Sequence, residues 1–190
     1  MTLTILLDID GVLADFCTAY LAVLNRQTGR RHVPADVTTW QFHDSVASKL
    51  EDHNVWAEAG RRGFCRDLAA YPGADDFLAR LRIYGRVVAV TAPASTAYWA
   101  SERTDWLRCR GFATKDIVLA HDKTLVQGDI LIDDSAANVR AYAQAHPDRE
   151  VALLDRPWNQ AEPGSWVNSV RCLGYREVLE RVSRLARRVV

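Results

Sequence analysis

The chain of 190 residues carries 24 acidic and 24 basic residues, so its formal net charge is zero, and 48% of its residues are hydrophobic. This length suits one domain or one domain with a modest insertion, and the composition is too apolar for a disordered chain. The charge balance gives no reason to expect duplex nucleic acid as a partner, and no apolar run approaches the length that would span a membrane.

The cysteines are scattered along the chain, without a C-x-x-C pair, at positions 17, 65, 109 and 172. This spacing argues against a zinc site and against a disulfide framework. No basic segment followed by a long apolar stretch opens the chain, so no secretion signal is expected. We therefore predict a cytoplasmic protein.

The first predicted element is a strand formed by the apolar run that ends at Leu7, immediately before Asp8, Asp10 and Gly11. The run is too continuous for a half-solvated strand, which favours a strand buried in a parallel sheet. Ligands bind at the carboxyl ends of such strands. Two carboxylates two residues apart share one face and repel each other, and Mg²⁺ would relieve that repulsion. An ordinary turn rich in Asp and Gly is the alternative interpretation.

No buried parallel strand is apparent between residues 15 and 71. The predicted elements of this segment are a helix, a turn-rich stretch and a second helix, over residues 15–28, 30–43 and 44–59. We interpret residues 15–71 as a helical cap inserted after the first strand. Residues 1–14 and 72–190 would then form the core.

Regular alternation of helices and strands begins after Pro72 and Gly73. The predicted strands are residues 86–91, 116–120, 129–133 and 150–155, and the predicted helices are residues 74–84, 95–110, 136–145 and 175–188. Helices of this length between strands imply an α/β fold with a doubly wound parallel sheet and right-handed crossovers.

Polar residues recur where the predicted strands end: Thr91, Lys123, and the pair Asp133 and Asp134. Each has an ordinary explanation alone, such as a helix cap or a solvated charge. In a parallel sheet, however, all of them would reach the edge that carries Asp8. Clustered carboxylates, a lysine and a hydroxyl suit a metal ion and a transferable phosphoryl group.

The order of these motifs resembles the four signatures of the haloacid dehalogenase-like phosphatases, which have a Rossmann-like core. The segments DIDGVLADF, GFCRDLAAYPGA, VTAP, KTLVQGDILIDDS and DRPWN are similar, more narrowly, to the 5′(3′)-deoxyribonucleotidase family. That family carries its helical cap between the first and second signatures, where the predicted insertion lies.

The resemblance implies a role for each core residue. Asp8 would be the nucleophile that forms an aspartyl-phosphate, and Asp10 would protonate the leaving group and later activate water. Thr91 and Lys123 would bind the phosphoryl oxygens. Relatives that cleave carbon–halogen bonds lack the second acid, so Asp10 implies a phosphatase.

The resemblance also implies a magnesium site. Asp8, the Asp10 backbone carbonyl and Asp134 would hold the ion. Asp133 would either support these ligands from behind or replace Asp134 as the ligand.

The substrate residues are the least specific part of the prediction. Phe16 matches an aromatic residue that faces the nucleoside in the family, and Trp40, Phe42 and Phe64 are candidates to stack on a base. These rings could equally form the core of the cap. Ala92 stands beside Thr91 in the phosphate site, where some relatives have a hydroxyl. Trp158 is interpreted as a packing residue.

We thus predict a Mg²⁺-dependent phosphomonoester hydrolase for deoxyribonucleoside monophosphates, with a homodimer left open. A related phosphatase for a sugar phosphate or a nucleic-acid 3′-phosphate is the first alternative. A receiver domain also groups acids, a threonine and a lysine around Mg²⁺, but its motifs occur in a different order along the chain. A catalytically inactive family member is the third alternative.

Overall fold

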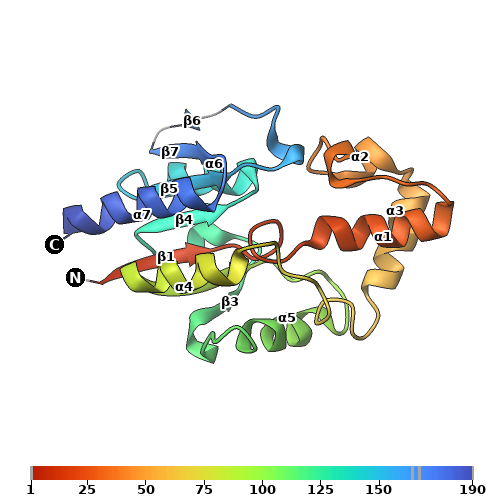
Figure 1. Ribbon diagram of the computed structural model, residues 1–190, viewed down its shortest axis with the longest axis horizontal. Helices are drawn as coiled ribbons and strands as arrows, with labels where there is room; N and C mark the ends of the chain where they lie inside the picture. Colours follow the sequence, from red (N-terminus) through yellow and green to blue (C-terminus); the bar gives the residue numbers. More distant parts are fainter. Residues whose placement is uncertain (1, 164, 167, 190) are drawn as a thin grey trace.

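The computed structural model describes residues 2–163, 165–166 and 168–189, which form a sheet flanked by helices (Figure 1). The strands are β1 (Leu3–Leu7), β2 (Gly85–Thr91), β3 (Ile117–Leu119), β4 (Ile130–Asp133), β5 (Glu150–Leu154), β6 (Ser165–Trp166) and β7 (Ser169–Cys172). The α-helices are α1 (Phe16–Thr28), α2 (Phe42–Val46), α3 (Lys49–Ala59), α4 (Ala74–Tyr84), α5 (Trp99–Arg108), α6 (Ala136–Ala145) and α7 (Tyr175–Val189). Short 3₁₀ turns are η1 (Pro34–Asp36), η2 (Thr114–Asp116), η3 (Lys123–Leu125) and η4 (Pro157–Asn159).

The sheet has the strand order β3-β2-β1-β4-β5-β7-β6, and every pairing except β6 with β7 is parallel. β1 lies between β2 and β4, with Leu7 opposite Ala89 on one side and Ile132 on the other. The chain crosses from one side of β1 to the other between β3 and β4. This switch point is the usual ligand site of a doubly wound sheet. The predicted fold class is confirmed.

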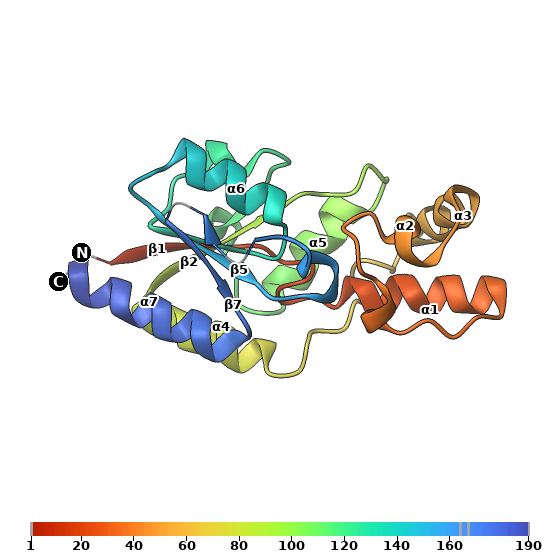
Figure 2. The same ribbon diagram turned by 90° about the horizontal axis from the view of Figure 1, so that it is seen from above.

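β1 is apolar throughout because both of its faces are covered. Ile5 and Leu7 belong to the core that contains residues of α4 and α7, whereas Leu6 packs in a second core with residues of α6. Figure 2 shows α6 on one side of the sheet, with α4 and α7 on the other. The continuous run in the sequence therefore reflects burial on two faces. None of the helices in the described part of the chain combines the length and the apolarity that a bilayer crossing requires.

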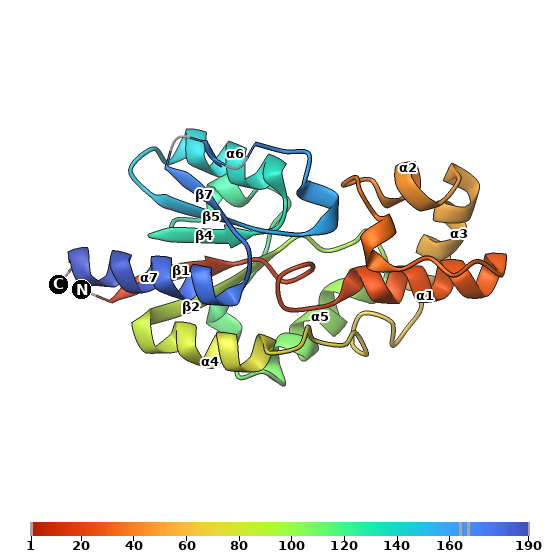
Figure 3. The ribbon, with the colours of Figure 1, turned by 45° about the horizontal axis from the view of Figure 1, so that its top comes forward.

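The segment between β1 and α4 lies beyond the carboxyl end of the sheet (Figure 3). The chain leaves and re-enters at adjacent points, where Ala14 and Ala70 form an antiparallel bridge. Within this segment α1, α2 and α3 share a separate hydrophobic core that includes Tyr20, Leu24 and Val55. The domain boundaries at residues 15 and 71 remain a prediction.

The prediction of one helix over residues 44–59 is wrong, because the structure contains α2 and α3 instead. Ser48 caps the start of α3: its side chain accepts a hydrogen bond from the Glu51 N–H, and the Glu51 carboxylate accepts one from the Ser48 N–H. This capping box begins a new helix and separates it from α2.

The strands β6 and β7 were not predicted. β7 is only four residues long and alternates poorly, because Arg171 and Ser169 interrupt its apolar pattern. β7 pairs with β5 and extends the sheet.

Candidate active site

The turn after β1 brings two distant segments into contact. The Asp8 N–H donates to the Ile132 carbonyl at 2.9 Å, which continues the β1–β4 ladder past the end of the strand. Gly11 then adopts a left-handed conformation with φ 76°. A Cβ atom on Gly11 would lie 2.0 Å from Asp134 Oδ2, so only glycine allows this close approach.

Lys123 links two of the predicted acids at the sheet edge. Its Nζ lies 2.6 Å from Asp8 Oδ1 and 2.7 Å from Asp133 Oδ2, and the residue is only 4% exposed. Burial lowers the pKa of the lysine, but the carboxylates of Asp133 and Asp8 outweigh burial and raise the pKa above its ordinary value. The ammonium therefore stays charged and fixes the orientation of Asp8.

Asp133 and Asp134 have different surroundings although they are adjacent. Both Asp133 oxygens are occupied: Oδ1 accepts from the Ser135 N–H, and Oδ2 accepts from Lys123 and Asn138. Asp134 Oδ2 accepts from Trp158 Nε1 at 2.8 Å. Asp134 Oδ1 is buried and has no hydrogen-bond partner within the part of the chain that the structure describes.

The surroundings of Asp134 fit a divalent cation. Oxygens of Asp8, Asp133 and Asp134 lie within 4.8 Å of one another. Burial and the charges of Asp8 and Asp133 raise the pKa of Asp134 well above its usual range, and burial raises that of Asp133 to about 6. A buried acceptor without a partner is costly, and a cation held by oxygen ligands would satisfy it. Asp134, with its free oxygen, suits direct coordination better than Asp133.

Asp10 has a partner that the sequence did not reveal. The fully buried Arg103 on α5 donates to Asp10 Oδ1 at 2.5 Å. Its guanidinium lies near the rings of Trp99 and Trp106, with centroids 5.7 and 5.4 Å away. Arg103 stands in the polar segment ERTDWL, where an arginine is expected to be a solvated surface residue. The sequence pattern therefore could not predict that Arg103 is buried.

A cavity of about 290 Å³ opens beside these acids. The predicted site residues that line it are Asp8, Asp10, Phe16, Trp40, Phe42, Thr91, Ala92, Lys123 and Asp134. Asp133 and Phe64 do not line it. The Phe64 ring packs against Phe16 and Trp99, with centroid distances of 6.4 and 6.1 Å, and lines a different cavity.

Aromatic rings form much of the cavity wall. Phe16 stacks on Trp56 at 5.3 Å and also contacts Phe42 and Trp99, with centroids 6.0 and 5.8 Å away. Trp40 is half exposed. Trp56 and Trp99 were missed by sequence reasoning, because a tryptophan on a helix does not reveal which neighbour it meets. Trp158, predicted only to pack, also donates to Asp134.

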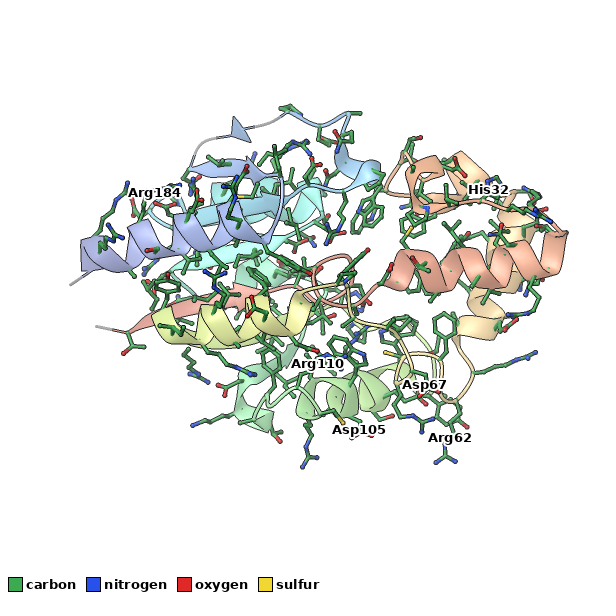
Figure 4. The ribbon with its side chains drawn as sticks, viewed as in Figure 1. His32, Arg62, Asp67, Asp105, Arg110 and Arg184 are labelled. Atoms are coloured by element: carbon green, nitrogen blue, oxygen red, sulfur yellow. The ribbon has the colours of Figure 1, made fainter. Side chains whose placement is uncertain are left out.

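The loop between α3 and α4 is hydrogen-bonded to α5. The Glu102 carboxylate is buried and accepts from the N–H groups of Gly63 and Arg66. Arg62 and Asp67 of the same loop are exposed, and Figure 4 shows Arg62 projecting away from the sheet. Glu102 thus anchors the loop next to the helix that supplies Arg103.

Comparison with known proteins identifies the family. The family model described as "5' nucleotidase, deoxy (Pyrimidine), cytosolic type C protein" matches residues 2–189. The chain belongs to this 5′-nucleotidase family. A Bordetella parapertussis protein named "Putative 5'(3')-deoxyribonucleotidase" is 33% identical over 167 residues, covering 82% of this chain and 85% of the relative. A relative of the same name from Bordetella bronchiseptica is 34% identical with the same coverage.

Solved structures share the fold. A haloacid dehalogenase-like hydrolase from Burkholderia xenovorans superposes with a TM-score of 0.64 at 11% identity, over 96% of this chain and 97% of that one. A Bacillus subtilis HAD-hydrolase bound to magnesium gives 0.57 at 16% identity, over 95% and 98%. The resemblance to haloacid dehalogenase-like phosphatases and to the deoxyribonucleotidases is therefore confirmed, and the chain is a phosphatase of the 5′-nucleotidase type.

Proposed function

We propose that this nucleotidase is a Mg²⁺-dependent hydrolase of deoxyribonucleoside monophosphates that works through an aspartyl-phosphate on Asp8. The main support is Lys123, which is buried, charged and bonded to both Asp8 and Asp133 beneath a cavity with aromatic walls. This arrangement offers a fixed nucleophile and a positive charge for phosphate. The aromatic rings that line the same cavity offer flat apolar surfaces for a base.

In the proposed reaction, an Asp8 oxygen attacks phosphorus and the ester bond to the nucleoside oxygen breaks. Lys123 holds Asp8 Oδ1, so Oδ2 is free to attack. Asp10 gives its proton to the departing oxygen, which leaves as the nucleoside hydroxyl. Water then attacks the aspartyl-phosphate and passes a proton to Asp10, and Asp8 is released as a carboxylate together with inorganic phosphate. Thr91 and Lys123 stabilise the phosphoryl oxygens throughout.

Mg²⁺ would be held by Asp8, the Asp10 backbone carbonyl and Asp134, and when bound it would neutralise charge on the phosphoryl group. Asp133 would keep Lys123 and the Ser135 backbone in place. The support for this ligand set is the free oxygen of Asp134 and the full hydrogen bonding of Asp133.

A substrate panel tests the proposal. Phosphate release is measured from deoxyribonucleoside 5′- and 3′-monophosphates, sugar phosphates and 3′-phosphorylated oligonucleotides, with Mg²⁺ and with EDTA. We expect many turnovers on the nucleotides and loss of activity with EDTA. Preference for sugar phosphates or oligonucleotides would reject the nucleotide assignment, and retention of one equivalent of phosphate would indicate a receiver-like module.

Mg²⁺ should stabilise the protein more at pH 7 than at pH 5. Burial raises the pKa of Asp133 on folding from 3.8 to about 6, and it also raises the pKa of Asp134 well above its ordinary value. The folded metal-free protein therefore holds protons that the unfolded chain has lost, so its stability falls as pH increases from about 4 to about 6. Cation binding must release these protons, so its affinity should fall roughly tenfold for each pH unit below the raised pKa.

Thermal unfolding at pH 5, 6 and 7, with and without Mg²⁺, measures this effect. Asp134→Asn should remove most of the Mg²⁺-dependent shift in Tm. An equal shift at pH 5 and pH 7 in the unmodified protein would contradict the proposed ligands.

We further propose that the enzyme acts in the cytoplasm. The word "cytosolic" in the family description and the free cysteines of the chain support this. Analytical ultracentrifugation measures the oligomeric state, including the homodimer that the sequence analysis considers.

A further inference from the structure

Trp158 contacts both an acid of the catalytic edge and the helical segment between β1 and α4. It lies in the turn η4, which follows β5, and is only 5% exposed. Its indole N–H donates to Asp134 Oδ2 at 2.8 Å. Its ring packs on Phe42 of α2, with centroids 5.3 Å apart, and belongs to the hydrophobic core of α1, α2 and α3. Figures 1 and 3 show the turn after β5 beside the segment that leads into α2. The proposed reaction gives this tryptophan no role.

The turn η4 is fixed by Asn159, the residue that follows the tryptophan. The Asn159 side chain is buried, and its amide nitrogen donates to the backbone carbonyls of Asp134 and Leu154 at 2.8 and 2.9 Å. Its carbonyl oxygen accepts from the Arg156 N–H and from the Arg171 guanidinium. Both donors and both acceptor positions of this amide are in use, so the turn has a fixed position against Asp134.

The Asp134 carboxylate has one oxygen that is held and one that is available. Oδ2 accepts from Trp158, and only glycine at position 11 leaves room for it, because a Cβ on Gly11 would lie 2.0 Å away. Oδ1 is buried and has no hydrogen-bond partner among the residues that the structure describes. A hydrogen bond to one carboxylate oxygen fixes the orientation of the whole group. The indole therefore decides which oxygen of Asp134 is left for a cation.

We propose that Trp158 is a positioning residue that orients Asp134 for the divalent cation, and that Phe42 holds the indole in place. This inference rests on the proposed metal ligands and goes beyond them. It makes cation affinity depend on two side chains that offer the metal no ligand atom. Residues that hydrogen-bond to metal ligands typically change metal affinity by about 10- to 100-fold when they are replaced.

Titration calorimetry of the metal-free protein with Mg²⁺ at pH 7 tests the proposal without any catalytic step. Trp158→Phe keeps an aromatic ring beside Phe42 but removes the N–H. We expect its Mg²⁺ dissociation constant to rise by about 10- to 100-fold. Turnover lost at low Mg²⁺ should return at saturating Mg²⁺, which a damaged fold would not allow. An unchanged dissociation constant, or lost turnover that saturating Mg²⁺ fails to restore, would overturn the proposal.

Trp106→Phe is the matched control, because it also removes one buried indole hydrogen bond. The Trp106 N–H donates to the Leu68 backbone carbonyl at 2.8 Å instead of to an acid. The Mg²⁺ affinity of this variant should therefore stay unchanged. A loss of affinity as large as that in Trp158→Phe would show that the effect is not specific to the bond with Asp134, and would overturn the assignment.

Phe42→Leu tests the ring contact, and it replaces Trp158→Phe if that variant does not fold. Leucine leaves the indole N–H in place but supports its ring less closely. The Mg²⁺ dissociation constant should rise by about 2- to 10-fold, the size of effects transmitted through packed side chains. Phe64→Leu is the control, because Phe64 packs on Phe16 and Trp99 and lines a different cavity. Equal Mg²⁺ affinities in Phe42→Leu and the unmodified protein would overturn the proposal.

The two proposals fail in different ways. If the unmodified protein does not bind Mg²⁺, or if Asp134→Asn binds it equally well, the proposed ligands are wrong and the inference fails with them. If Asp134→Asn loses Mg²⁺ binding but Trp158→Phe keeps full affinity, the ligands hold and the role of Trp158 is rejected. If both variants lose affinity but the protein hydrolyses no nucleotide, the proposed substrate is wrong and the role of Trp158 holds.

Discussion

Replacing Asp8 by asparagine is expected to lower phosphate release from nucleotides by a factor on the order of 10⁴ or more, as loss of a covalent nucleophile does in other enzymes. An amide oxygen is too weak a nucleophile to form the acyl-phosphate. The variant should still fold, because Lys123 keeps its ion pair with Asp133. Steady-state phosphate release and thermal unfolding measure the two properties separately.

Two further measurements make the Asp8 result specific. Acid quenching during turnover, followed by mass spectrometry of peptides, should find phosphate on the peptide containing Asp8 in the unmodified protein alone. Asp129→Asn changes an acid at the opposite end of the sheet, where it accepts from the Thr4 N–H, and should leave turnover unchanged. Activity of Asp8→Asn close to that of the unmodified protein would rule out the covalent route.

Replacing Asp10 by asparagine is expected to lower kcat for nucleotides by about 10²- to 10⁴-fold, the usual contribution of general acid–base catalysis. The alkoxide of a nucleoside is a poor leaving group and needs the proton that Asp10 would supply. p-Nitrophenyl phosphate releases a stable phenolate that needs no proton. We therefore expect a much smaller loss in the first chemical step with that substrate.

Pre-steady-state release of p-nitrophenolate tests this difference. The burst of p-nitrophenolate, which reports formation of the phosphoenzyme, should persist in Asp10→Asn. The later hydrolysis of the phosphoenzyme should become slower in this variant. Asp15→Asn is a suitable control, because Asp15 caps α1, does not line the catalytic cavity, and asparagine is an equally good cap. Equal losses with both substrates would contradict a role for Asp10 in protonating the leaving group.

Much of the fold could be predicted because its signals are local. The run ending at Leu7 is apolar on both faces, and β2 and β4 are short apolar segments that end at a polar residue, Thr91 and Asp133. Such patterns depend only on burial of each element. Where the pattern was weak, as at Ser169 and Arg171 in β7, the strand was missed.

The second helix shows a different limit. The residues from 44 to 59 look helical throughout, and the break depends on one reciprocal pair of hydrogen bonds between Ser48 and Glu51. The S-x-x-E pattern was readable in the sequence. However, a capping box inside a helical pattern does not by itself tell whether the helix stops there.

The sequence by itself determined which side chains could reach the catalytic edge, because parallel strands direct all of their carboxyl ends to one side. That argument predicts that Asp8 and Lys123 lie close together, although more than half of the chain separates them in sequence. Only the tertiary structure decided what each of them meets there. Arg103 beside Asp10, Trp158 on Asp134 and Tyr20 on Asp52 depend on how helices and loops pack, and packing partners far apart in sequence leave no periodic signal in the chain.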